Sequence, residues 1–192
     1  GGCLDNNPDG SACDDFSIFY ANHGPGVSGT DIYNVDLGSG VADLSFEFNL
    51  PYEDHIAYQE DAALVLFVNA NGNFVDFYDP ATGTIESQLS LANGINTLYA
   101  VVYNANDEKL YVGDDSDNKI YAVDLTDGSY EFVADAPIHG GDLILIDNEL
   151  YVATRAGDEL RKVVGSSTEF VQNIPADVNG ACADANNNIL LA

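Results

Sequence analysis

The chain has 192 residues, of which 46% are hydrophobic, and its 32 acidic against 5 basic residues give a net charge of -27. This length and composition predict a folded chain with a sizeable core. The charge argues against nucleic acid or an anionic membrane as a partner, because phosphate binding requires clustered Lys and Arg. No apolar run approaches the ~18 residues that span a bilayer. The acidity is typical of a solvated surface, of cation binding, or of both.

The first predicted segment is an acidic loop over residues 1–15, which contains "CLDNNPDGSACDD". Its alternating Asp and Asn residues, followed by Gly, match the start of a calcium loop, D-x-[DN]-x-[DN]-G, in which side-chain oxygens converge on one hard cation. The twelfth position of that pattern, normally Glu, is Phe16. The candidate metal ligands are Asp5, Asn7, Asp9 and Asp14. The stretch resembles the calcium loops of thrombospondin type 3 repeats and dockerins, which implies calcium. The alternative is a metal-free linker.

Three cysteines, Cys3, Cys13 and Cys182, form no C-x-x-C pair, so zinc is not indicated. For an exported chain we expect a disulfide between Cys3 and Cys13, which enclose a short polar loop, and a thiol at Cys182. Three reduced, buried cysteines are the alternative. A lipid-anchored Cys3 is a further alternative, although two residues precede it.

A repeat begins after the loop. "LYV" at Leu110 recurs at Leu150, 40 residues later, and "LFV" at Leu66 stands 44 residues earlier. Turn motifs such as "VDLGSG", "YDPATG", "VDLTDG" and "VVGSS" fall at matching points. The pattern predicts units of roughly 40–45 residues. The predicted units lie near 16–50, 55–91, 97–135 and 141–174, with the start of another at 180–192.

Each unit is predicted to hold four short strands, because runs rich in Val, Ile, Tyr and Phe alternate with Asn, Asp and Gly clusters. In the third unit the predicted strands are Leu98–Tyr103, Leu110–Asp114, Lys119–Leu125 and Ser129–Val133. One four-stranded sheet cannot bury both faces, so the units must pack on one another. The sequence therefore predicts an all-β fold, a β-propeller of four-stranded antiparallel blades in residues 16–192. A β-sandwich is the alternative, but it does not predict this period.

The stretch "KLYVGDDSDNKIYAVDLTDG" resembles the YVTN and NHL-type β-propeller repeats, and "NELYVATRAGDELRKV" resembles them loosely. The resemblance extends over about residues 16–192 and implies the fold. It implies little about function, because the group includes binding scaffolds, cell-surface proteins and a few enzymes.

Catalytic chemistry is weakly indicated. His55 and His139 precede or begin predicted innermost strands, where two side chains can face a central funnel, and His23 lies in a Gly-rich turn. No nucleophile elbow, P-loop or HExxH is present. The neighbouring carboxylates are Glu53, Asp54 and Asp142, and the scattered polar candidates for a central ion are Gln59, Asn104 and Asp147. The strand tyrosines, interpreted as packing residues rather than a sugar-binding shelf, are Tyr111, Tyr121 and Tyr151.

Two functions follow as hypotheses. The first, which we favour, is an extracellular or cell-surface module with a structural or recognition role, binding protein or glycan surfaces or associating with itself. The second is a calcium-dependent hydrolase, similar to lactonases, with its site in the central channel. Because the chain stops within a fifth unit, its edge is expected to continue in a longer protein, to close a small ring, or to pair with a neighbouring subunit as an oligomer or filament.

Overall fold

The computed structural model describes fifteen stretches of the chain, and before His55 it describes the backbone together with one side chain, that of Val41. The described residues are 2–5, 16–22, 30–36, 41–48, 55–59, 61–69, 74–79, 81–92, 95, 98–138, 141–155, 157–176, 178, 180–183 and 187–191.

The described elements are all strands. They are β1 (Gly2–Asp5), β2 (Phe16–Asn22), β3 (Thr30–Asp36), β4 (Val41–Phe48), β5 (His55–Gln59), β6 (Leu64–Asn69), β7 (Phe74–Asp79), β8 (Thr84–Ser90), β9 (Leu98–Asn104), β10 (Lys109–Asp114), β11 (Lys119–Asp124), β12 (Tyr130–Asp135), β13 (Asp142–Ile146), β14 (Glu149–Thr154), β15 (Glu159–Val164), β16 (Ser167–Asn173), β17 (Ala181–Ala183) and β18 (Ile189–Leu191).

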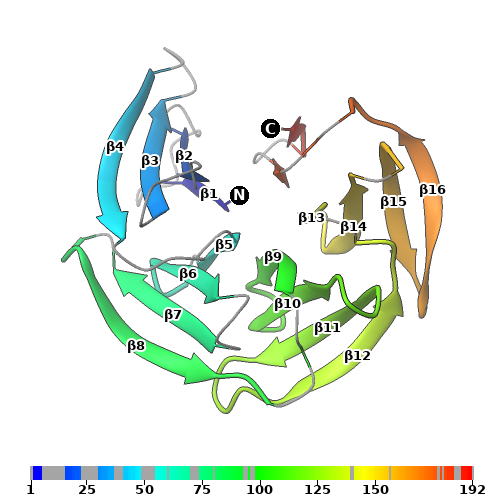
Figure 1. The fold of residues 1–192 in the computed structure, drawn as a ribbon, viewed down its shortest axis with the longest axis horizontal. Helices are drawn as coiled ribbons and strands as arrows, with labels where there is room; N and C mark the ends of the chain where they lie inside the picture. Colours follow the sequence, from blue (N-terminus) through cyan, green and yellow to red (C-terminus); the bar gives the residue numbers. More distant parts are fainter. Residues whose placement is uncertain are drawn as a thin grey trace.

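The strands form four four-stranded sheets and a two-stranded sheet, each in sequence order. We call them blade A (β1–β4), blade B (β5–β8), blade C (β9–β12), blade D (β13–β16) and blade E (β17–β18). Figure 1 shows the blades arranged around a common centre, with the first strand of each innermost and the fourth strand outermost. This arrangement is a β-propeller, and it confirms the predicted fold class.

The strands of blade C match their predicted positions to within two residues. Adjacent strands pair in register, with Leu110 opposite Val123 and Val112 opposite Tyr121. Side chains alternate between the two faces of a strand, so Leu110 and Val112 face blade B while Tyr111 faces blade D. The period of two therefore buries both faces of blade C, as the sequence argument requires.

Two details differ from the sequence analysis. Residues 2–5, assigned to the N-terminal loop, form β1 and pair with β2 as the innermost strand of blade A. The short "GCLD" segment carries too little alternation to be distinguished from the polar run after it. In addition, Val65 rather than Leu66 is equivalent to Leu110, so the repeat offset is 45 residues rather than 44. Val65 pairs with the residue before Asp79, and Leu110 pairs with the residue before Asp124. Residues 65–68 are all buried, which hides the register.

Apolar side chains fill the junctions between blades. The B–C junction packs Leu66, Val68 and Val75 of blade B against Leu98 and Leu110 of blade C. The C–D junction and the D–E junction hold separate clusters, around Ile138 and around Ile144 respectively. Blades C and D are thus held on both sides by their neighbours, and the outermost strand β16 is almost wholly exposed.

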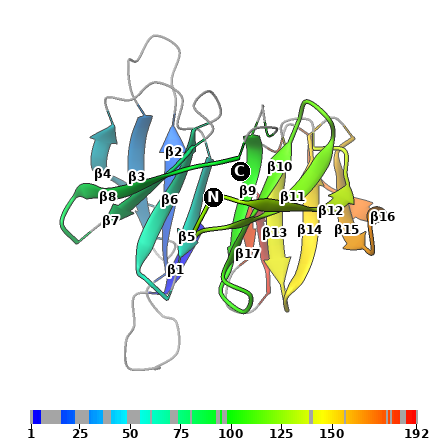
Figure 2. The ribbon, with the colours of Figure 1, turned by 90° about the horizontal axis from the view of Figure 1, so that it is seen from below.

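The first strands of the blades all run in the same direction, which gives the ring two distinct ends (Figure 2). At the strand-start end, β5, β9 and β13 begin with His55, Leu98 and Asp142. At the opposite end, which we call the hairpin end, the turns between the first and second strand of each blade emerge. In blades C and D these turns comprise residues 105–108 and 147–148.

Aspartates shape many of the turns. The side chains of Asp79, Asp114 and Asp124 each accept a hydrogen bond from the backbone N–H two residues later, at 2.8 Å. The Thr126 hydroxyl and then its backbone N–H lower the pKa of Asp124 by binding its charged form. Asp at these positions therefore specifies where strands end, which accounts for part of the acidic composition.

Candidate functional site

A cavity of about 330 Å³ lies among the innermost strands and opens toward the hairpin end. Blades B, C, D and E all contribute to its wall. The polar lining residues are Tyr58, Tyr103, Asn104, Asn106, Asp147, Asn148 and Cys182. Asn104 and Asp147, scattered in the sequence, are thus brought together in one cavity. We call it the axial cavity.

A second cavity, of about 290 Å³, continues outward along the junction between blades C and D. It shares Asn104, Leu145 and Asn148 with the axial cavity. Farther out it is lined by Tyr111, Glu149 and Lys162 among others. We call this second cavity the C–D groove. The two cavities adjoin at the residues they share, and we refer to them together as the hollow.

The turn between β15 and β16 accounts for the open groove. Val164 pairs with Ser167, so this turn has two residues, whereas Val123 pairs with Tyr130 around the longer turn of blade C. The longer turn packs tightly on blade B: a Cβ on Gly128 would lie 2.2 Å from the backbone oxygen of Ser90. A Cβ on Gly165 would meet nothing within 4 Å, and Gly165 lines the groove.

Hydrogen bonds between neighbouring blades fix the polar side chains at the hairpin end. Asn106 donates through its side-chain amide to Asn148 of blade D, and its backbone N–H donates to Asn104 Oδ1 at 3.0 Å. Asn187 of blade E donates to Asp147 Oδ1 at 2.8 Å. The adjacent Asp147 and Asn148 both have positive φ, 50° and 63°, which Asn and Asp tolerate better than other residues. The side chains that face the cavities are therefore preorganised.

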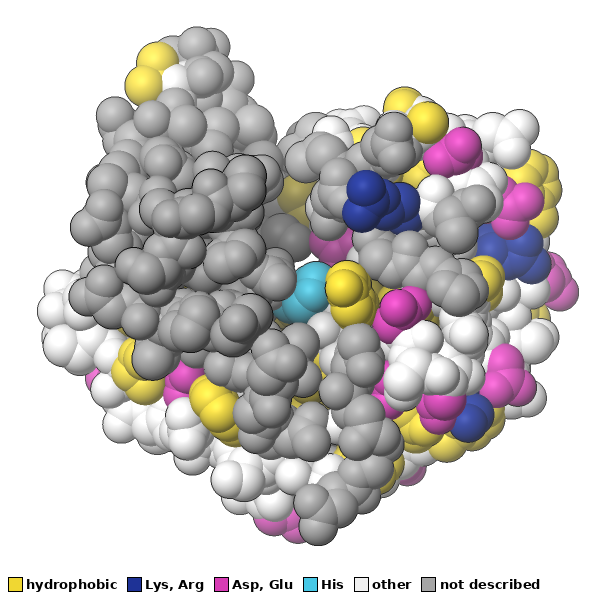
Figure 3. All heavy atoms as spheres, in the orientation of Figure 1, with side chains coloured by type: hydrophobic (Ala, Val, Ile, Leu, Met, Phe, Trp, Pro, Cys, Tyr) yellow, Lys and Arg dark blue, Asp and Glu magenta, His cyan; other side chains and the backbone are white. Residues whose placement is uncertain are grey.

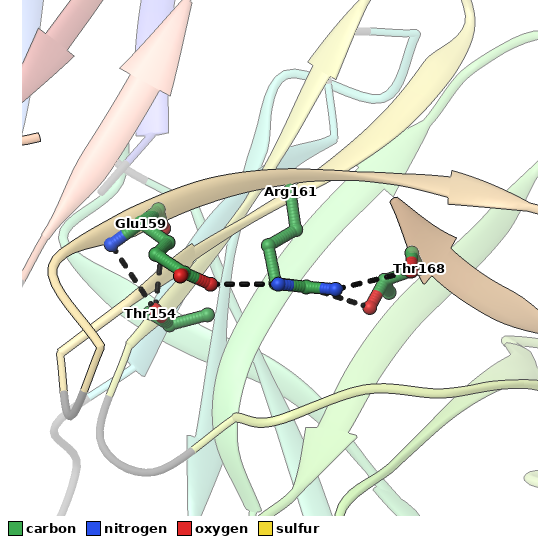
Figure 4. A network of polar contacts seen from close by, with 4 residues as sticks. All are labelled: Thr154, Glu159, Arg161 and Thr168. Atoms are coloured by element: carbon green, nitrogen blue, oxygen red, sulfur yellow. Dashed lines mark hydrogen bonds and ion pairs between the residues drawn. The ribbon is translucent and has the colours of Figure 1, made fainter. Parts of the chain in front are cut away.

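The basic residues are largely neutralised by carboxylates. Lys162 pairs with Glu149 at 2.5 Å beside the groove, and this pairing raises the pKa of Lys162 and lowers that of Glu149. In blade D, Arg161 donates to Glu159 at 2.6 Å and to the hydroxyl of Thr168 at 2.9 Å (Figure 4). Lys109 and Lys119 also pair with carboxylates. In Figure 3 acidic side chains are spread over the described part of the face shown, with few cations among them.

The strand tyrosines have the packing role that the sequence suggests. Tyr111, Tyr121 and Tyr151 are half-buried in the interblade clusters. The hydroxyls of Tyr111 and Tyr121 donate to the aspartates four residues earlier, Asp107 at 2.6 Å and Asp117 at 2.8 Å. Burial, followed by this hydrogen bond to Asp107, raises the pKa of Tyr111 to about 12.

Tyr103 differs from them, because its hydroxyl is buried at the B–C junction and makes no hydrogen bond of normal geometry. Burial raises its pKa to about 12, and the Asp61 carboxylate adds to this shift. Because the hydroxyl makes no hydrogen bond, we treat Asp61 as its charged neighbour. Gln59, predicted as a central ligand, also has a buried side-chain oxygen without a hydrogen bond.

At the strand-start end, the structure describes two of the residues proposed for catalysis, His55 and Asp142, and both contact a neighbouring blade. His55 begins β5, and its ring lies 5.3 Å from that of Tyr99 in the next blade. Asp142 is buried and accepts hydrogen bonds from the backbone N–H groups of Leu143 and Ala181, both at 2.9 Å. It therefore joins blade D to blade E. The candidates His23, Glu53, Asp54 and His139 lie outside the described residues.

The predicted calcium loop is the connection between β1 and β2. Asp5 ends β1, where its backbone pairs with that of Phe16. Asn7, Asp9, Asp14 and Cys13 lie outside the described residues, and of Cys3 the structure describes the backbone within β1. Cys182 lies half-buried on β17. The calcium site and the Cys3–Cys13 disulfide remain predictions.

Sequence reasoning missed Asn106, Asn148 and Lys162 as parts of the hollow. The available signal was the turn motif "VVGSS". Compared with "VDLTDG", it has no Asp and its Gly follows the strand sooner, which predicts a shorter turn. Among the side chains that the structure describes, no three His, Cys, Asp or Glu residues come together as a metal site. The described part of the chain also contains no helix with the length and hydrophobicity needed to cross a membrane.

Comparison with known proteins supports the fold class. No protein-family model and no curated protein matches the chain. A Bacteroides thetaiotaomicron protein of unknown function has a similar structure, with 16% identity and a TM-score of 0.61 over 95% of this chain and 54% of that one. Myxococcus xanthus glutaminyl cyclase gives 10% identity and a TM-score of 0.66 over 99% of this chain and 83% of that one.

A chain of the nidogen/laminin complex gives 12% identity and a TM-score of 0.61, over 84% of this chain and 63% of that one. This chain therefore spans 54% of the Bacteroides structure and 63% of the nidogen/laminin one. At these identities the similarity establishes the β-propeller fold and not an activity.

Proposed function

We propose that this β-propeller is an extracellular or cell-surface recognition module that binds a partner at its hairpin end. The observation that carries the proposal is the pair of adjoining cavities, the axial cavity and the C–D groove, where side chains from successive blades are held by hydrogen bonds to one another. Such an arrangement suits binding, because the ordering cost of the polar groups has been met before the ligand arrives.

The proposal includes the wider features predicted from sequence. Calcium bound by Asp5, Asn7, Asp9 and Asp14 would order the connection between β1 and β2 and leave the other blades unchanged. Protein or glycan surfaces are the expected partners, with self-association through exposed outer strands as a further mode.

A calcium-dependent hydrolase is the second candidate, favoured by the convergence of Asn104 and Asp147 on the axial cavity. One experiment separates the two functions. Saturation binding of the labelled protein to immobilised matrix proteins and glycans is measured beside hydrolysis of a panel of lactones and esters, with calcium and with chelator. Saturable binding without hydrolysis supports the recognition module. Calcium-dependent hydrolysis without such binding would overturn it.

A further inference from the structure

We infer that the axial cavity and the C–D groove together bind a neutral oligosaccharide. This inference rests on the proposed recognition function and names the class of ligand. It starts from size. The two cavities, of about 330 and 290 Å³, share three lining residues and therefore lie side by side. Each is close to the lower end of the ~300–1,000 Å³ range of small-molecule sites, and two adjoining cavities suit a short chain of rings.

The polar groups of the hollow suit hydroxyl groups. Asn104, Asn106 and Asn148 supply amides, Asp147 and Glu149 supply carboxylates, and these five residues offer both donors and acceptors. A sugar hydroxyl both donates and accepts, so adjacent hydroxyls can be bound by such a mixed set. The hydrogen bond from Asn106 uses the side-chain oxygen of Asn148, which leaves the amide N–H groups of Asn148 to donate to a ligand.

The walls of the hollow are apolar where the C–H faces of a sugar ring would lie. Val102, Leu143 and Leu145 line the axial cavity, and Val133 and Val163 line the groove. Tyr58 and Tyr111 contribute aromatic rings to the two cavities. A hollow with an amphipathic lining of this kind favours an amphipathic ligand over a purely ionic one.

Charge decides between neutral and anionic ligands. Lys162, the basic residue that lines the groove, is paired with Glu149 at 2.5 Å. The chain carries a net charge of -27, which repels polyanions at a distance. A bare divalent cation is disfavoured too, because the described side chains offer no group of three His, Cys, Asp or Glu residues for it. A neutral polyhydroxylated ligand meets neither obstacle.

The test measures binding of neutral trisaccharides to the full chain by isothermal titration calorimetry, at millimolar concentrations. The neutral probes are cellotriose, maltotriose and tri-N-acetylchitotriose, and the anionic probe is trigalacturonate. We expect at least one neutral probe to bind and trigalacturonate to bind more weakly. Asn148→Gly, which suits the positive φ of 63° while removing the amide, should weaken binding about tenfold or more.

The matched control is Asn118→Gly. Asn118 also has a positive φ, 57°, but it lies in a turn at the strand-start end of blade C. This variant should bind the neutral probe as the wild type does. A third variant replaces Gly165 and Ser166 with Leu-Thr-Asp-Gly, the longer turn of blade C. It removes no polar lining side chain, yet it should abolish binding by covering the groove. Circular dichroism checks that each variant is folded.

The inference is overturned if no neutral probe binds, if trigalacturonate binds best, or if Asn148→Gly and the lengthened turn both retain wild-type affinity. Saturable binding to immobilised protein partners, without binding of any trisaccharide, would reject the oligosaccharide and leave the recognition function standing. Calcium-dependent hydrolysis of the panel of lactones and esters, without saturable binding to any matrix protein or glycan, would reject the recognition function itself.

Discussion

The B–C and C–D junctions are built from equivalent strands but end differently. At both junctions, a backbone N–H at or just after the end of the outermost strand donates to the turn between the third and fourth strands of the next blade. Ala92 donates to the backbone oxygen of Gly128 and Asp135 to that of Ser166, each at 3.1 Å. At the B–C junction the turn lies against Ser90 with no room for a Cβ. At the C–D junction the shorter turn leaves a groove lined by Gly165.

This difference shows how a repeated fold can form a groove at one interblade junction. The inner strands and interblade clusters are maintained in both junctions, because each blade needs two apolar faces to pack. A change of two residues in one outer turn alters nothing in that packing, and it opens a polar hollow between two rigid blades. Function can therefore be placed at one junction of a repeated fold without cost to the others.

The largest expected effect is at the tight B–C turn. Gly128→Ala should destabilise the protein by about 2–4 kcal/mol, because the new Cβ meets the Ser90 backbone and φ is positive at 74°. Gly165→Ala has a positive φ but places its Cβ in open space, and Gly83→Ala, also at positive φ, places its Cβ 3.9 Å from the Tyr78 hydroxyl, an ordinary contact; each should cost only about 1 kcal/mol. Urea denaturation measures all three. Equal losses of stability in Gly128→Ala and Gly165→Ala would show that the turns at the B–C and C–D junctions are packed equally loosely.

The second effect concerns the interior of the C–D junction, where the blades are close-packed beneath the groove. A Cβ on Gly113 would lie 2.9 Å from Ile138 Cδ1, so Gly113→Ala should cost about 1–2 kcal/mol. Ile138→Val removes that methyl group, and the double variant should lose less than the sum of the single losses. Additive losses would indicate that the junction is not tightly packed there.

The third effect contrasts two tyrosines. Tyr111→Phe should cost about 1 kcal/mol because it breaks the hydrogen bond to Asp107, whereas Tyr103→Phe removes a buried hydroxyl without a hydrogen bond and should be nearly neutral. The native pKa of each tyrosine is about 12, above the unfolded value of about 10. The contribution of each protonated tyrosine to the free energy of unfolding is complete below about pH 10 and is lost as the pH rises through about 12.

Denaturation curves between neutral and alkaline pH test this assignment. Each Phe variant should lose less stability than the wild type over that alkaline range, since one titrating group has been removed. An unchanged alkaline slope for Tyr103→Phe would contradict the burial of its hydroxyl in the native state.

The smallest effect is at the first-to-second-strand turns. Ala63 of blade B and Glu108 of blade C have positive φ, 54° and 57°, at the turn position before the second strand. Ala63→Gly and Glu108→Gly should each stabilise the protein by about 0.5 kcal/mol, because glycine removes backbone strain. Thermal unfolding measures the gain. A loss of stability in both variants would show that the strain is negligible compared with the entropy of glycine.

Much of the fold could be predicted from sequence, because the period of two and the turn residues are local signals. Leu98–Tyr103 is already predicted as the first strand of the third unit, and the turn aspartates mark the strand ends. The first strand could not be found, since residues 2–5 have too short a pattern. The hollow was predictable only in part. Asn104 and Asp147 were named as candidates, but the meeting of Asn104 with Asp147 and Asn148 depends on how blades C and D are rotated against each other, which no local pattern encodes.

The most direct test of the account is a chemical-shift map of the amide groups during titration with the neutral trisaccharide that binds best. The account predicts changes at the residues that line the two cavities, namely residues 57–58, 101–106, 111, 133, 143–150, 162–165 and 182–183, with the strand-start ends of blades B, C and D unperturbed. Changes confined instead to the strand-start end, around His55 and Tyr99, would contradict it.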